Sequence, residues 1–191
     1  MTIFITKAGN NMRVITGSAR GRRLREPTGN DIRPTTDQVK ESVFNILQFD
    51  IEGRRMLDLF GGTGQMGIEA LSRGAERVTF VDSSLQAVKL IKENLKTTGF
   101  IDSADVINGN SLTFLESCGK YDIIYIDPPY KTNLAEEALS RIFAFDILKD
   151  NGIIVCESLY GTPMPDAVAP YAKKKERKYG RIGITVYTKE I

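Results

Sequence analysis

The run Asp127-Pro128-Pro129-Tyr130 directly follows an apolar, strand-like segment, residues 121–126. The Asp127 carboxylate and the Pro128 carbonyl could accept hydrogen bonds from an amino group and so direct its lone pair at an electrophile. Consecutive prolines fix φ and remove N–H donors, which keeps the loop stiff. Tyr130 offers a flat face for stacking an extruded base. We therefore predict that these four residues are catalytic, although a strand end turned by prolines is the alternative.

The residue at position 127 also bears on which base would react. Guanine presents two adjacent donors, N1-H and the N2 amino group, which an acceptor-only carboxylate can bridge. Adenine presents a donor next to an acceptor and suits an amide better. Asp127 therefore favours guanine over adenine.

A glycine-rich turn supplies the second signal, because Asp58-Leu59-Phe60-Gly61-Gly62-Thr63-Gly64 lies where a predicted strand ends and a helix begins. The spacing also fits the dinucleotide pattern GxGxxG, with Asp82 twenty residues after Gly62 to hold a ribose. A pyrophosphate would be repelled by Asp58, whereas the sulfonium and ammonium of S-adenosylmethionine would be attracted. We therefore predict S-adenosylmethionine as the cofactor, with a glycine turn and a helix cap at Asp58 as the purely structural alternative.

A third strand end carries Gly109-Asn110-Ser111, where Asn110 could bind the adenine edge or could instead cap a helix. The predicted cofactor-binding residues are Asp58, Phe60, Gly61, Gly62, Gly64, Asp82, Ser83, Asn110 and Ser111.

The elements that must position these residues alternate between strand and helix patterns from Arg54 onward. Such alternation predicts a parallel sheet covered on both faces, with ligands at the carboxyl ends of its strands. The stretch 174–189 predicts an antiparallel hairpin turning at Tyr179-Gly180. The expected fold is α/β and Rossmann-like: a mostly parallel seven-stranded sheet with a C-terminal antiparallel hairpin and a small basic N-terminal arm.

The N-terminal region reads as a separate unit. Residues 1–35 are expected to form an extension and a basic RNA-binding arm, with a strand at Arg13–Thr16, and residues 36–191 the methyltransferase domain. Residues 1–11 could be an addition before a natural start at Met12. Thr35 or Thr36 can cap a helix running to about Gln48. The RNA contacts predicted from the arginines of this region are Arg13, Arg20, Arg22, Arg23 and Arg33.

Charge is unevenly distributed along the 191 residues, whose formal net charge is +2. Residues 1–40 and 171–191 each carry +5, and the middle of the chain carries −8. Basic ends suit a polyanion such as nucleic acid, although they could also serve solubility alone. The run Lys173–Lys178 could add a phosphate contact or be a solvated face.

Composition excludes some chemistries. The chain has no histidine and only two cysteines, so we expect neither a zinc site nor a histidine base. No apolar run is long enough to span a membrane and no signal pattern begins the chain, so we expect a soluble, cytoplasmic monomer without membrane association.

Taken together, these motifs resemble the RsmD-type family of bacterial 16S rRNA guanine-N2 methyltransferases over nearly the whole chain from Met12. The resemblance rests on six segments, with small departures such as Gln38 in place of a usual arginine: residues 13–17, 20–24, 33–45, 58–64, 71–75 and 127–130. It implies an S-adenosylmethionine-dependent enzyme that methylates the guanine at position 966 within a 30S subunit or its assembly intermediate. It also implies RNA contacts from the arm, Arg33 and Lys40.

Two other functions remain open at this point. A DNA adenine-N6 methyltransferase also uses this catalytic motif but usually carries a further sequence-reading domain. A non-catalytic RNA-binding assembly factor would not need both Asp58 and Asp127 intact.

Overall fold

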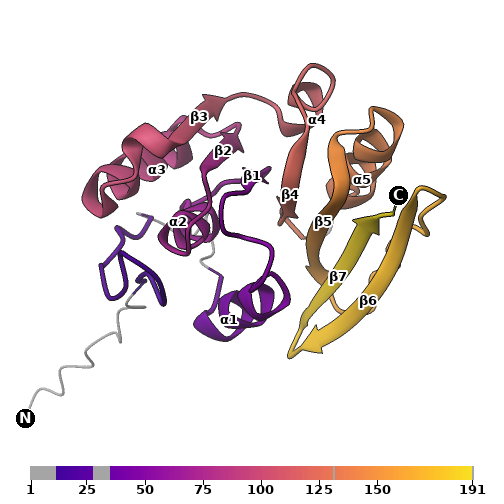
Figure 1. The fold of residues 1–191 in the computed structure, drawn as a ribbon, viewed down its shortest axis with the longest axis horizontal. Coiled ribbons are helices and arrows are strands. Elements are labelled where there is room, and N and C mark those ends of the chain that lie inside the picture. The colour runs from indigo at the N-terminus through magenta and orange to yellow at the C-terminus, as the bar shows by residue number, and fades with distance from the viewer. Residues whose placement is uncertain (1–11, 28–34, 131, 191) are drawn as a thin grey trace, which may run out of the picture.

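The computed structural model describes residues 12–27, 35–130 and 132–190. Its centre is a seven-stranded sheet in the order β3-β2-β1-β4-β5-β7-β6 (Figure 1). Strands β1 to β5 are mutually parallel, and β7 runs antiparallel to both β5 and β6. The predicted fold class and C-terminal hairpin are confirmed.

The strands are β1 (Arg55–Asp58), β2 (Arg77–Asp82), β3 (Ala104–Asn108), β4 (Tyr121–Ile126), β5 (Leu148–Leu159), β6 (Tyr171–Tyr179) and β7 (Ile182–Lys189). The helices are α1 (Asp37–Ile46), α2 (Gln65–Ser72), α3 (Leu85–Thr98), the short α4 (Ser111–Phe114) and α5 (Leu134–Ala144), with a 3-10 turn at Ile101–Ser103.

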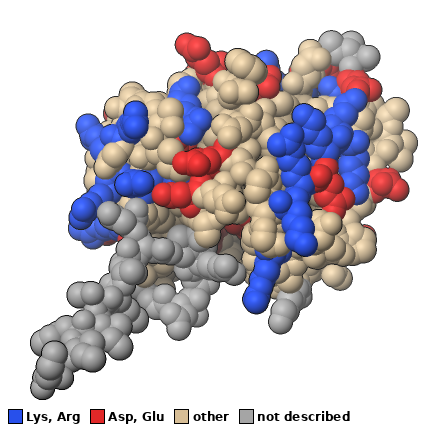
Figure 2. Space-filling model, turned by 90° about the horizontal axis from the view of Figure 1, so that it is seen from below, with Lys and Arg blue, Asp and Glu red and all other residues tan. Residues whose placement is uncertain are grey.

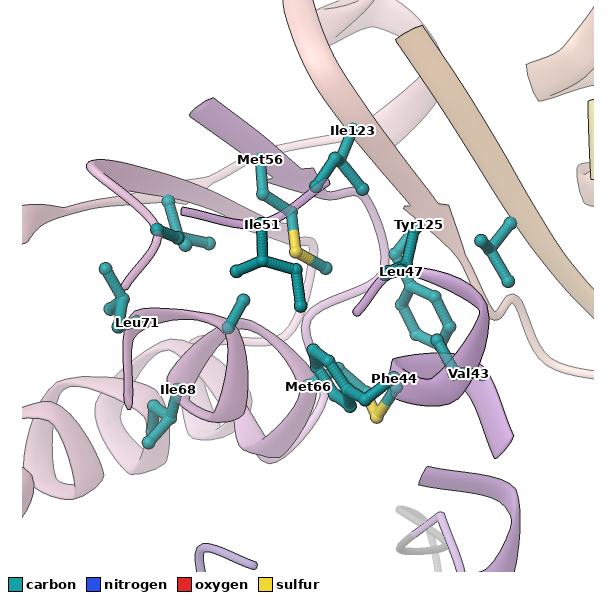
Figure 3. Close-up of a cluster of buried hydrophobic side chains, with 14 of the residues drawn as sticks. Val43, Phe44, Leu47, Ile51, Met56, Met66, Ile68, Leu71, Ile123 and Tyr125 are labelled. Atoms are coloured by element: carbon teal, nitrogen blue, oxygen red, sulfur yellow. The ribbon is translucent and has the colours of Figure 1, made fainter. Parts of the chain in front are cut away.

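Helices cover both faces of the sheet. One hydrophobic cluster joins α1, α2 and α3 to one face, and a second joins α4 and α5 to the other. In the first cluster, Val43 and Phe44 of α1 and the C-cap residue Leu47 lie opposite Met56 and Tyr125 of the sheet (Figure 3). Helix α1 therefore covers the part of the sheet that includes β4.

The first helix begins where the sequence indicates. The Thr36 hydroxyl accepts a hydrogen bond from the backbone N–H of Val39 at 3.4 Å, so Thr36 is the N-cap. The helix ends at Ile46, slightly before the predicted Gln48.

The sheet order creates a natural ligand site. Strand β1 lies between β2 and β4, and the chain builds outward from β1 in both directions. At such a switch point the loops after neighbouring strands diverge and leave a crevice at the carboxyl ends.

The arm is held by side chains of the domain. The N–H groups of Ile15 and Thr16 donate to the buried Glu69 carboxylate at 2.7 and 2.9 Å. Because these donors are used by Glu69, the predicted strand at Arg13–Thr16 is wrong, and it is reduced to a single bridge between Arg13 and Arg23. The arm thus docks on α2 instead of extending a sheet.

Some expectations fall outside the described residues. They concern Arg33 and the proposed extension 1–11. Within the described ranges, no helix has the length and apolar character needed to cross a membrane.

Helix α2 approaches β2 closely at Gly67. A Cβ there would lie 2.3 Å from Cε1 of Phe80 and 2.7 Å from Cγ1 of Val78. We expect Gly67→Ala to lower the free energy of unfolding by about 1–3 kcal/mol through overpacking. Gly119→Ala is the matched control, since a Cβ at Gly119 meets no atom within 4 Å. Urea denaturation of both variants measures this, and equal stabilities would contradict the packing argument.

Candidate active site

A cavity of about 480 Å³ opens at the carboxyl ends of the central strands. Its walls come from α1, the glycine turn and the loops after β2, β3 and β4. All four predicted catalytic residues line it, together with every predicted cofactor residue except Gly64: Asp58, Phe60, Gly61, Gly62, Asp82, Ser83, Asn110, Ser111, Asp127, Pro128, Pro129 and Tyr130. Residues predicted from three separate motifs therefore share one space.

Asp58 lies at the end of β1, is only 1% exposed, and faces this cavity. Its Oδ2 accepts a hydrogen bond from the Gly67 N–H at 3.2 Å. Burial raises the pKa of Asp58 to about 8, against the opposing effect of this hydrogen bond, and the nearby Asp127 and Asp82 raise it further. A carboxylate in this position would be stabilised by a cationic ligand.

Asp82 organises the glycine turn as well as facing the cavity. Its two oxygens accept hydrogen bonds from the N–H groups of Gly62 and Ser84, at 2.9 and 2.8 Å. Gly62 and Gly64 have φ values of 52° and 77°, which favour glycine. Gly64 does not line the cavity but is the N-cap of α2, so its contribution is to shape the turn.

Asn110 serves as a helix cap. Its Oδ1 accepts from the N–H groups of Leu112 and Thr113 at 2.9 and 3.0 Å, so the capping alternative is confirmed. The neighbouring Ser111 hydroxyl donates to the Leu59 carbonyl at 2.6 Å and ties the loop after β3 to the end of β1. Both residues still line the cavity, and an adenine contact from Asn110 stays a prediction.

The loop after β4 brings Asp127 and Tyr130 to the same wall of the cavity. Asp127 is half-buried, Pro128 is buried and Pro129 is exposed. The Pro129 carbonyl accepts a hydrogen bond from the Thr132 hydroxyl at 2.7 Å, which braces the loop.

Two functional candidates were not predicted from the sequence. Glu157 of β5 and Tyr125 of β4 are almost fully buried, line the cavity, and are joined by a hydrogen bond from the tyrosine hydroxyl to Glu157 Oε1. Burial and the charge of Asp127 hold the pKa of Glu157 well above its usual range. An acidic residue directly after the apolar run Ile153–Cys156 was the available signal.

Lys40 requires a correction. Its side chain has no exposed surface, and Nζ donates to the Arg13 carbonyl at 2.6 Å and lies 4.0 Å from Oε2 of Glu69. Burial lowers its pKa. A lysine enclosed in this way cannot reach a phosphate, so Lys40 anchors the arm to the domain instead of contacting RNA.

The predicted arginines of the arm are exposed and lie apart from the cavity. Arg22 donates to the Thr97 carbonyl at 2.9 Å, and Arg13 lies 3.9 Å from Asp37. Arg20 and Arg23 are also exposed. None of the four belongs to the cavity lining within the described residues.

The polar groups that line the cavity fit S-adenosylmethionine. All four predicted residues line the cavity: Asp58 would face the cationic amino acid end, Asp82 would accept from ribose hydroxyls, and Asn110 and Ser111 would border the adenine. Carboxylates accept hydrogen bonds and attract positive charge, so this lining favours a cationic, hydroxyl-bearing ligand and repels a pyrophosphate.

Comparison with known proteins supports this interpretation. A family model described as "Conserved hypothetical protein 95" matches residues 12–188. The Haemophilus influenzae protein named Ribosomal RNA small subunit methyltransferase D is 36% identical, over 94% of this chain and 95% of its own length.

Solved structures agree. An Escherichia coli structure described provisionally as a methyltransferase has a TM-score of 0.85 and 32% identity, covering 94% of this chain and 98% of that one. A more distant structure, also described provisionally as a methyltransferase and complexed with SAH, has a TM-score of 0.63 at 16% identity, covering 79% of this chain and 48% of that one. It shares the fold.

The burial of Asp58 has a measurable consequence for stability. Its folded-state pKa of about 8 exceeds the unfolded value of about 4, so the folded protein binds more protons and its stability falls as pH rises across that interval. We expect Asp58→Asn to stabilise the cofactor-free protein on the order of 2 kcal/mol at pH 8 and to have little effect near pH 4.

The same variant should weaken binding of S-adenosylmethionine by at least about tenfold, because the anionic partner of the ligand is removed. Thermal unfolding at several pH values and calorimetric titration measure the two effects. A variant that is less stable at pH 8, or that binds the ligand as tightly as the wild type, would show that Asp58 is not a strained cation-binding carboxylate.

Proposed function

The chain belongs to the RsmD-type family, Conserved hypothetical protein 95, and from that premise we propose that it methylates N2 of a guanine in 16S rRNA. The fold is that of S-adenosylmethionine-dependent methyltransferases. The guanine is the one at position 966, and the substrate is a 30S subunit or its assembly intermediate. The observation that carries the proposal is that Asp127 and Tyr130 share a cavity with Asp58 and Asp82.

The chain's own groups would align the base. S-adenosylmethionine, when bound, supplies an activated methyl group, so the protein need not form a covalent intermediate. Asp127 and the Pro128 carbonyl accept hydrogen bonds from the amino group and orient its lone pair. Tyr130 stacks on the base, and α1 together with Leu134 shields the cavity from water.

Basic surfaces on either side of the molecule support an RNA substrate. Figure 2 shows Lys and Arg side chains gathered in two groups with a strip of neutral and acidic residues between them. The groups lie on the sides where Figure 1 places the arm and the β6–β7 hairpin. The exposed basic residues of these two regions are Arg13, Arg20, Arg22, Arg23 and Arg25 of the arm and Lys174, Lys175, Arg177, Lys178 and Arg181 of the hairpin region.

This distribution suits RNA that crosses the domain. The two basic groups would bind phosphates, while the acidic cavity between the arm and the hairpin excludes phosphate and admits a base. A DNA adenine methyltransferase and a non-catalytic binder remain the competing functions.

Asp127→Ala should lower methyl transfer to rRNA by about 100- to 1000-fold, because the amino group loses its charged acceptor. Affinity for S-adenosylmethionine should stay within a few-fold. Transfer of labelled methyl followed by digestion to nucleosides measures both the rate and the product. Asn133→Ala is the control, since Asn133 is exposed and makes no side-chain capping bond. Wild-type turnover in Asp127→Ala would refute the proposed role.

Replacing Lys175 and Arg177 together with glutamine should weaken RNA binding. It should also make the slope of log affinity against log salt shallower by about one for each phosphate that is no longer neutralised. Lys120→Gln is the control, because Lys120 directly precedes β4 and so lies at the amino ends of the strands, whereas the cavity lies at their carboxyl ends. Filter binding over a salt series gives the slope, and an unchanged slope removes the hairpin from the RNA interface.

A further inference from the structure

Glu157 lies beside the proposed catalytic loop, and packing alone does not explain why an acidic residue occupies this buried position. Strands β4 and β5 are parallel, with Tyr125 opposite Val155 and Ile126 opposite Cys156. One step further, Glu157 lies alongside Asp127, and Asp127 and Glu157 both line the cavity. Neighbouring strands lie about 4.8 Å apart, a spacing comparable to the width of a purine's hydrogen-bonding edge.

The surroundings of Glu157 favour a protonated carboxyl. The side chain is 2% exposed, and no lysine or arginine in the described part of the chain forms an ion pair with it. The ionisable groups around it are Asp127, Asp58, Tyr125 and the adjacent Cys156, and the residue paired with it on β7 is Ile184. Burial and the two nearby acids oppose its ionisation and together outweigh the hydrogen bond from Tyr125, which lowers the pKa of Glu157, so that this pKa is raised.

The hydrogen bond to Tyr125 determines which oxygen carries the proton. Because the tyrosine hydroxyl donates to Oε1, that oxygen acts as the carbonyl, and the proton belongs on Oε2. A protonated carboxyl in this state presents one donor and one acceptor side by side. Asp127, in contrast, supplies acceptors.

We propose that Glu157 determines specificity for guanine by pairing with the base next to the reacting amino group. Its O–H donates to O6 and its carbonyl oxygen accepts from N1-H, while Asp127 accepts from the N2 amino group. This inference rests on the proposed function and assigns the cavity's second acid to base recognition. The residue touches the base but not the transferred methyl group.

The test compares two substrates that share the reacting amino group. 2-Aminopurine keeps the N2 amino group but lacks O6 and N1-H. Small-subunit particles are reconstituted with RNA carrying guanine or 2-aminopurine at the target position, and kcat/KM for methyl transfer is measured on each. We expect the wild type to prefer guanine by about tenfold to a hundredfold, the discrimination that a paired two-bond contact provides.

Three variants separate recognition from structure. Glu157→Leu should lower the guanine rate to near the 2-aminopurine rate and leave the latter within about twofold. Glu157→Gln should keep most of the preference, since an amide also presents one donor and one acceptor. Ser158→Ala, the next residue on β5, should resemble the wild type. Melting temperature and S-adenosylmethionine affinity verify that each variant is folded.

The pH profile gives a second readout. The wild-type guanine rate should fall above neutral pH as Glu157 loses its proton, and Glu157→Gln should show a smaller fall, since an amide does not titrate. Equal losses on both substrates in Glu157→Leu, unchanged rates, or a glutamine variant as poor as leucine would overturn the role of Glu157. Absence of transfer to guanine by the wild type would instead overturn the proposed function, and this inference with it.

Discussion

The convergence of carboxyl groups at one edge of a parallel sheet is the constraint on which the rest of the site depends. Asp58, Asp82, Asp127 and Glu157 each lie at or near the end of a strand and line a single cavity. Buried carboxylates are costly unless donors or cations offset them. Here backbone N–H groups at Gly62 and Gly67 and the Tyr125 hydroxyl do so in part. A cationic cofactor and the donor-rich edge of a guanine would supply the remainder, which links the fold to its choice of ligands.

The same constraint accounts for the arrangement of positive charge. Arginines and lysines close to the cavity would neutralise its acids, and none of the described lysines or arginines lines it. Exposed basic groups lie elsewhere, among them those of the arm and of the outer hairpin. The arm is tied back to the domain by side chains with little or no exposure. The Asn94 amide accepts from the Arg25 N–H at 2.7 Å and donates to the Thr63 carbonyl at 3.0 Å. One side chain therefore connects the arm to the glycine turn.

Sequence patterns predicted the alternation of strands and helices and the ligand site at the carboxyl ends of the strands, because strand periodicity and turn residues are local signals. They failed where a side chain's role depends on a distant partner. Lys40 looks like a phosphate ligand until Glu69 and the Arg13 carbonyl are placed around it. Glu157 looks like part of a strand until Asp127 is placed beside it at the cavity. Residues 13–16 form no strand because Glu69, over fifty residues away, accepts the N–H groups of Ile15 and Thr16.

The measurement that tests the central claim most directly is the modification state of 16S rRNA from cells that lack this protein. Mass spectrometry of the fragment containing position 966 would compare the parent strain, the deletion strain and the deletion strain carrying the gene. The account predicts N2-methylguanosine at that position in the first and third and unmodified guanosine in the second. Full methylation in the deletion strain, with a methyl group missing elsewhere in RNA or DNA, would contradict it.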